Sequence, residues 1–173
     1  MDIDREKYKA LYEYQKLQFE DEKGQFFRLE EKAIRYLSFL TLSIPIYLFI
    51  FNFLLNKLQD SISCFLYFVV FFSFLFSILC FCSAWSLIFR SIKLMKIPKL
   101  PSDKQLIDFF LDNDLATVYW DRAEKYSEAI TIYMRLNEKK INLINLAYNE
   151  ITFGSWAFVI SIGLLVMTKM VFV

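Results

Sequence analysis

The stretch ISCFLYFVVFFSFLFSILCFCSAWSLIF, residues 62–89, contains no charged side chain. A helix of this length crosses the hydrocarbon core of a bilayer with some tilt. Trp85, near its end, suits the interface between membrane and water. The stretch therefore predicts a transmembrane helix, and it favours an all-α membrane protein.

Two further apolar segments flank this stretch along the chain. Residues 36–55, YLSFLTLSIPIYLFIFNFLL, carry no charge, and residues 151–173, ITFGSWAFVISIGLLVMTKMVFV, carry only Lys169. About twenty helical residues span the ~30 Å of a hydrocarbon core. We therefore expect three transmembrane helices, 36–55, 62–89 and 151–173, joined by a polar turn at 56–61. Pro45 should kink the first of them, with Thr41 helping to satisfy the freed carbonyl.

The polar segments, residues 1–35 and 90–150, read as amphipathic helices. Their apolar residues recur at spacings of three, four or seven, the pattern of one helix packing on another. This seam packs either on another helix of the chain or on a further copy in an oligomer. Its residues are Tyr12, Phe19 and Phe26 in the first segment and Tyr126, Ile130, Tyr133 and Asn137 in the second. Gln15 and Glu22 interrupt the first seam, and Asn137 and Lys140 interrupt the second. We expect a cytoplasmic helical bundle formed by the N-terminal helix and a long helix.

The second polar segment has its own start and stop signals. Pro98 and Pro101 end the preceding helix, and Ser102 with Gln105 forms a capping box for a short helix. That helix should end at about 112–114. A long helix should then run from about Leu115 to Glu150 and continue without a break into the last span.

The charges also predict an orientation in the membrane. Residues 1–35 hold eight Lys and Arg and residues 90–150 hold ten, out of 20 in the chain. The positive-inside rule then places the N-terminus and residues 90–150 in the cytoplasm and the C-terminus outside. Arg90, Lys93, Lys96 and Lys99 either anchor the second span or contact anionic lipid headgroups.

Composition argues against several classes of protein. The net charge of +1 gives no field to attract nucleic acid, so we predict no direct nucleic-acid binding. Histidine is absent, and all three cysteines lie inside one apolar stretch, so we predict neither a metal nor a cofactor. The acidic pairs sit in charged, solvated stretches where carboxylates keep ordinary pKa values. We therefore expect no enzyme.

Polar side chains form a stripe along two of the predicted spans. The candidates are Ser38, Thr41 and Asn52 in the first span and Ser73 and Ser77 in the second. Such stripes either line a pore or let helices pack closely. Because three spans cannot enclose an aqueous path alone, a pore would need a homo-oligomer of closed symmetry.

A cluster of cations marks the long helix. Arg135, Lys139 and Lys140 lie on adjacent turns and are candidates to contact a nucleotide or another anion. The alternative is a solvated face of mixed charge, since acidic residues are interleaved along the same helix.

The layout resembles the SLATT group of bacterial membrane effectors. The stretches that carry the resemblance are ALYEYQKLQFEDEKGQFFRLEEKAIRYLSFL, residues 10–40, and YSEAITIYMRLNEKKINLINLAYNEI, residues 126–151. The resemblance implies a pore-forming effector of anti-phage defence, silent until a nucleotide or protein signal reaches its cytoplasmic side. The last span departs from that layout. Small membrane proteins accessory to RNA-targeting CRISPR systems have a similar size and helical character.

The expected function is therefore a homo-oligomeric pore or channel gated through its cytoplasmic helices. The expected partners are the lipid bilayer, further copies of the chain, and a nucleotide signal or a soluble defence protein. The alternative is a non-conducting membrane anchor or regulatory subunit that docks a soluble partner on residues 102–150.

Overall fold

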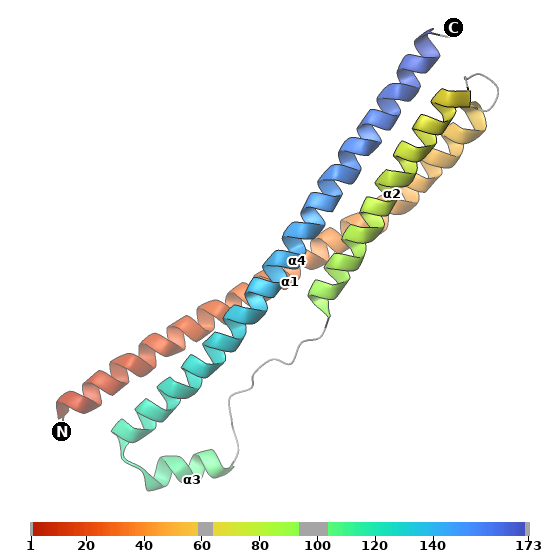
Figure 1. Cartoon of the computed structure of the whole chain (residues 1–173). Coiled ribbons are helices and arrows are strands. Elements are labelled where there is room, and N and C mark those ends of the chain that lie inside the picture. The colour runs from red at the N-terminus through yellow and green to blue at the C-terminus, as the bar shows by residue number, and fades with distance from the viewer. Residues whose placement is uncertain (1, 59–63, 94–103, 172–173) are drawn as a thin grey trace. The chain divides into compact units, whose positions relative to one another are not determined.

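The computed structural model describes residues 2–58, 64–93 and 104–171, which form four helices and no strand. These helices are α1 (Asp2–Leu58), α2 (Cys64–Ile92), α3 (Lys104–Asp112) and α4 (Leu115–Val171), shown in Figure 1. The predicted all-helical fold is confirmed. Residues 56–58 of the expected turn belong to α1, and Lys96, Lys99, Pro98, Pro101 and Ser102 lie outside the described residues.

The long last helix begins where the sequence predicts. The Thr117 hydroxyl donates to the carboxylate of Asp114, and the backbone N–H groups that follow Asp114 also point to that carboxylate, as at a helix N-cap. These hydrogen bonds lower the pKa of Asp114. From Leu115 the helix runs through Glu150 to Val171, so the predicted continuity of the long helix is confirmed.

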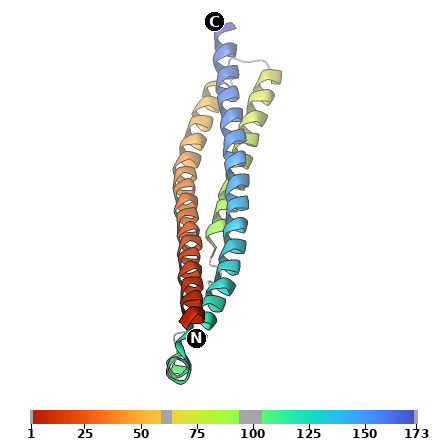
Figure 2. The same cartoon turned by 90° about the vertical axis from the view of Figure 1, so that its left-hand side faces the viewer.

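The chain forms two compact units, and α1 and α4 contribute to both. The first unit comprises Met1–Glu30 with Leu94–Ile141, and the second comprises Glu31–Lys93 with Asn142–Val173. In the first unit α1 lies beside α4, as both Figure 1 and Figure 2 show.

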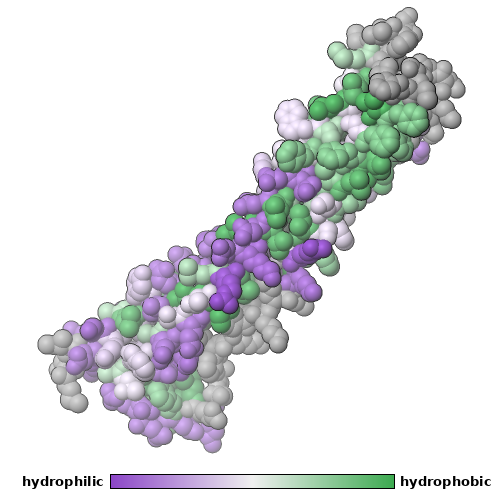
Figure 3. Space-filling model, in the orientation of Figure 1, coloured by the Kyte–Doolittle hydropathy of each residue, from purple (hydrophilic) through white to green (hydrophobic). Residues whose placement is uncertain are grey.

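Within the described residues, two helices are long and apolar enough to cross a membrane, one within Asp4–Phe53 and the other Tyr67–Ile92. Only 11% and 33% of their most apolar windows are buried, whereas the core helix of a soluble protein is mostly buried. In Figure 3, hydrophobic side chains gather over the second unit, which holds α2 and the uncharged stretch of α1. Both features favour association with a membrane. The expected third span, 151–173, extends beyond the described residues and stays a prediction.

Aromatic packing forms the core of the second unit. The Tyr47 ring lies 5.4 Å from that of Phe74 and 4.7 Å from that of Phe158, between centroids. The Tyr47 hydroxyl donates to the Phe74 carbonyl at 3.0 Å. Helix α1 continues through Pro45, and the Thr41 hydroxyl donates to the Leu37 carbonyl at 2.8 Å. Because Pro45 has no backbone N–H, the Thr41 carbonyl loses its hydrogen bond within the helix. We expected the Thr41 hydroxyl to help satisfy this carbonyl, but the hydroxyl donates to the Leu37 carbonyl instead.

Candidate functional site

An aromatic seam joins α1 to α4 in the first unit. Its ring pairs are Tyr12–Tyr119, Phe19–Tyr126 and Phe26–Tyr133, with centroids 5.5, 5.2 and 5.7 Å apart. Each step of seven residues on α1 is matched by a step of seven on α4, which is the pairing of a parallel coiled coil. The predicted seam residues therefore lie together, with Ile130 half-buried near them.

The two polar residues that interrupt the α4 seam both find partners on α1. The Asn137 amide nitrogen donates to the Glu22 carbonyl at 3.0 Å and to the Glu22 carboxylate at 2.8 Å. Its Oδ1 is buried and accepts no hydrogen bond from the described residues. Lys140 is only 1% exposed, and its Nζ lies 3.7 Å from Glu30 Oε1 and 3.6 Å from the centroid of the Phe26 ring.

Burial controls the charge of Lys140. Removal from water lowers the pKa of its ammonium group, and the neighbouring Glu30 carboxylate opposes this in part. Lys140 is thus a buried cation held by one carboxylate and one aromatic face, while Arg135 and Lys139 are exposed. The structure does not bring these three candidate anion contacts to a common site.

The sequence reasoning missed the roles of Glu22 and Glu30. A signal was present, because polar residues interrupt the seam on both helices. Glu22 on α1 and Asn137 on α4 interrupt opposite sides of one contact, so each supplies the hydrogen-bond partner of the other.

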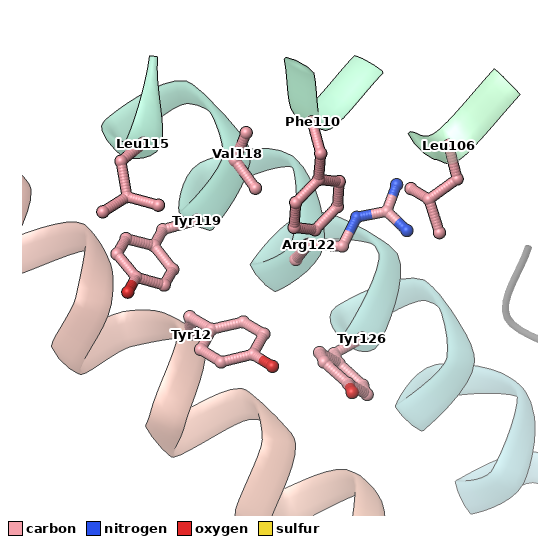
Figure 4. Close-up of a pocket in the computed structure, with 8 residues that line it drawn as sticks. All are labelled: Tyr12, Leu106, Phe110, Leu115, Val118, Tyr119, Arg122 and Tyr126. Carbon is pink, nitrogen blue, oxygen red and sulfur yellow. The ribbon is translucent and has the colours of Figure 1, made fainter. Parts of the chain in front are cut away.

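A cavity of about 340 Å³ lies at one end of the seam (Figure 4). It lies between α1, α3 and α4 and is partly open to solvent. Its lining residues are Tyr12, Leu106, Phe110, Leu115, Val118, Tyr119, Arg122 and Tyr126. The Arg122 Nε donates to the Asp121 carboxylate at 2.9 Å. Burial, with Tyr12 adjacent, raises the pKa of Tyr126. Aromatic walls with one cation suit a small molecule rather than a chain.

The α2 stripe is used within the second unit. The Ser77 hydroxyl donates to the Gly154 carbonyl at 2.7 Å, and the Ser73 hydroxyl donates to the Ala157 carbonyl at 3.3 Å. Ser161 Oγ lies 2.7 Å from Ser73 Oγ. A Cβ added to Gly154 would lie 3.0 Å from the Phe81 ring, so α2 and α4 approach closely here. Ser73 and Ser77 thus serve helix packing, the second of the two roles their spacing allowed.

The α1 stripe, Ser38, Thr41 and Asn52, is exposed instead. At 100° of turn per residue, the three side chains fall within roughly 60° of one another around α1. The buried side of the same stretch carries Leu40 and Tyr47. The two stripes that look alike in the sequence therefore have different positions in the fold.

Among the described residues, no group of three or more Cys, Asp or Glu side chains could hold a metal ion. Cys80 and Cys82 are free thiols, the first buried and the second exposed. No family model, curated protein or solved structure matches the chain.

Proposed function

We propose that this chain is a homo-oligomeric pore of the bacterial inner membrane, gated through the helices of its first unit. One observation carries the proposal: the α1 stripe places Ser38, Thr41 and Asn52 on an exposed face of the uncharged stretch of α1 that follows residue 35. Lipid offers an amide such as Asn52 no hydrogen bond, and burying it unpaired costs about 2–7 kcal/mol. Further copies of α1 or water in a lumen would satisfy it, as would water at the membrane interface, since Asn52 lies near the end of the predicted span 36–55.

The fate of the α2 stripe supports assigning the lumen to α1. Ser73 and Ser77 bond across the helix contact to α4 carbonyls and Ser77 is fully buried, so α4 separates this face of α2 from any path for ions. A ring of closed symmetry would bring the α1 stripe of each copy to the contact between copies or to the axis.

The orientation and the biological role belong to the same proposal. The distribution of Lys and Arg supports a cytoplasmic first unit and an external C-terminus after a third span. The resemblance to SLATT effectors supports a role in anti-phage defence, with depolarisation or permeabilisation of the membrane as the outcome.

Dye release from liposomes tests the pore. The purified chain should release a small dye, either alone or after addition of extract from phage-infected bacteria. Ser38→Leu and Asn52→Leu should reduce release by at least about tenfold if polar contacts of ~1.4 kcal/mol or more are lost. Ser83→Leu, at an exposed serine of α2 outside the stripe, should leave release unchanged. No leakage under either condition would contradict the proposal.

A second function is a non-conducting anchor that docks a soluble partner on the first unit. It is favoured by α3, where Ile107 and Leu111 are 60% and 79% exposed. The mass of the detergent-solubilised particle separates the two functions. A closed ring of this chain alone favours the pore, whereas a monomer bound to another protein favours the anchor.

A further inference from the structure

We propose that the cavity at the end of the seam is a binding site for a flat aromatic molecule with a single negative charge. Its volume of about 340 Å³ is at the small end of ligand pockets, so it fits a molecule of one or two rings. The site concerns the first unit alone, and it goes beyond the proposed pore.

The walls supply the aromatic part of the recognition. Tyr12, Tyr119 and Tyr126 come from the seam, and Phe110 comes from α3. In Figure 4 these rings surround the space from the α1, α3 and α4 sides. Aromatic rings prefer offset or edge-to-face packing on one another, so four rings around one space favour a planar aromatic occupant over a branched aliphatic one.

Arg122 supplies the recognition of charge. Its guanidinium has five N–H donors, of which two are engaged by the Asp121 carboxylate. The side chain is 15% exposed, so the remaining donors lie in a largely desolvated place where an anion is bound more strongly than in water.

The surroundings limit the charge of the ligand. Asp121 offsets the charge of Arg122, and the Glu20 carboxylate is close enough to help raise the pKa of Tyr126. A ligand with two or more negative charges would be repelled by these carboxylates. A monoanion, an aromatic carboxylate or a phosphate diester, would share Arg122 with Asp121 through the N–H donors that Asp121 leaves free, and the carboxylates would repel it less than a dianion.

Occupancy would act directly on the contact between α1 and α4. Tyr12 packs on both Tyr119 and Tyr126 in the seam, with centroids 5.5 and 5.8 Å apart, and all three rings also line the cavity. A ring inserted against them therefore changes the packing of the seam at its end.

Isothermal titration of the full chain in nanodiscs tests the site, with empty nanodiscs as the blank. The probe is 2-naphthoate, with 2-naphthylmethanol as the uncharged analogue, hexanoate as the analogue without rings and adenosine monophosphate as the doubly charged one. We expect one saturable site for 2-naphthoate with a Kd of roughly 0.1–1 mM, typical of a ligand of about a dozen heavy atoms. The three other probes should bind at least about tenfold more weakly, the equivalent of one charge-assisted hydrogen bond or one ring contact.

Substitutions assign the binding to this cavity. Arg122→Gln should weaken 2-naphthoate binding by at least about tenfold. Arg135→Gln, at an exposed arginine of the same helix, should leave the Kd unchanged. Absence of saturable binding would overturn the proposal, as would equal binding to the Arg122→Gln variant. The comparison of the four probes on the unaltered chain needs no variant: equal affinity for the naphthoate and the alcohol would also overturn it.

Discussion

The ion pair between Lys140 and Glu30 should respond unequally to the loss of its two members. Lys140 is 1% exposed, whereas the Glu30 side chain is 31% exposed. Replacing Glu30 with glutamine leaves a buried cation without its counter-charge. Replacing Lys140 with methionine removes the buried charge and leaves a carboxylate that water can reach. The first change should therefore destabilise the first unit more than the second, although both remove the same ion pair.

The geometry sets the magnitude. Breaking a fully buried pair costs about 3–5 kcal/mol, but this pair is 3.7 Å apart and one member is partly solvated. We expect Glu30→Gln to cost about 1–2 kcal/mol. Lys140→Met should fall within ~1 kcal/mol of the parent, since it loses the contact with the Phe26 ring but also the cost of burying an ammonium group.

Hydrogen exchange of the full chain in nanodiscs measures these differences locally. Glu30→Gln should accelerate exchange of amides in residues 126–141 by roughly 5–30-fold. The matched control is Glu31→Gln, since Glu31 pairs with Arg35 at 3.8 Å on the exposed surface and such pairs contribute ~0–1 kcal/mol. The double variant should exchange more slowly than Glu30→Gln alone. The reasoning fails if Lys140→Met accelerates exchange as much as Glu30→Gln.

Three further outcomes follow from the packing. Gly154→Leu should destabilise the second unit by about 1–3 kcal/mol, measured by thermal unfolding in detergent, because the added side chain meets the Phe81 ring. Gly163→Leu, where the added side chain has open space, should be neutral or stabilising. Equal effects of the two substitutions would contradict the close approach of α2 and α4 at Gly154. Tyr133→Ala should reduce the stability of the first unit by about 3–5 kcal/mol, because the side chain is buried in the seam. Met134→Ala, at an exposed side chain, should reduce it by less than about 0.5 kcal/mol. Similar losses of stability, measured by hydrogen exchange, would be inconsistent with the seam. The pKa of Lys140 is lower in the folded chain than in the unfolded chain, so the unfolded chain holds the Lys140 proton more tightly. The stability of the first unit should therefore rise with pH from the pKa of Lys140 in the folded chain up to about pH 10, by at most ~1.4 kcal/mol per pH unit. Above that pH the trend reverses, because the pKa of Tyr133 is raised by burial and its phenol loses its proton more readily in the unfolded chain. The rise in stability below about pH 10 should be absent in Lys140→Met.

Local sequence signals were enough to predict the helices and the residues of the seam. The seven-residue spacing of Tyr12, Phe19 and Phe26 matches that of Tyr119, Tyr126 and Tyr133, but the register that pairs them is visible only in the structure. The predicted start of the long helix at about Leu115 is confirmed, and the structure shows that Asp114 caps it.

The partners of individual buried polar side chains could not be predicted in the same way. Periodicity places Lys140 rather than Lys139 in the seam, but Glu30 and Phe26, which contact its ammonium group, lie on another helix. Likewise, serines spaced by four suit either a pore or a helix contact. The contact of Ser77 with Gly154 depends on how α2 packs on α4, which no local pattern of α2 contains.

The cavity could not be predicted from the sequence either. Its lining joins Tyr12 of α1, Phe110 of α3 and Arg122 of α4, which are far apart along the chain. From the sequence, Arg122 is one cation among interleaved acidic residues, with the same two interpretations as Arg135: an anion contact or a solvated face of mixed charge. The tertiary fold of the first unit places it beside aromatic rings.

Ion selectivity in planar bilayers tests the central claim, that the α1 stripe lines a conducting path. Asn52→Asp and Asn52→Lys place opposite charges at one exposed stripe position, and Ser83→Asp and Ser83→Lys provide the controls outside the stripe. If Asn52 faces the lumen, the aspartate should shift the reversal potential toward cation selectivity and the lysine toward anion selectivity, while the Ser83 variants should shift neither. Identical reversal potentials for all four variants, or no single-channel currents from the unaltered chain, would contradict the claim.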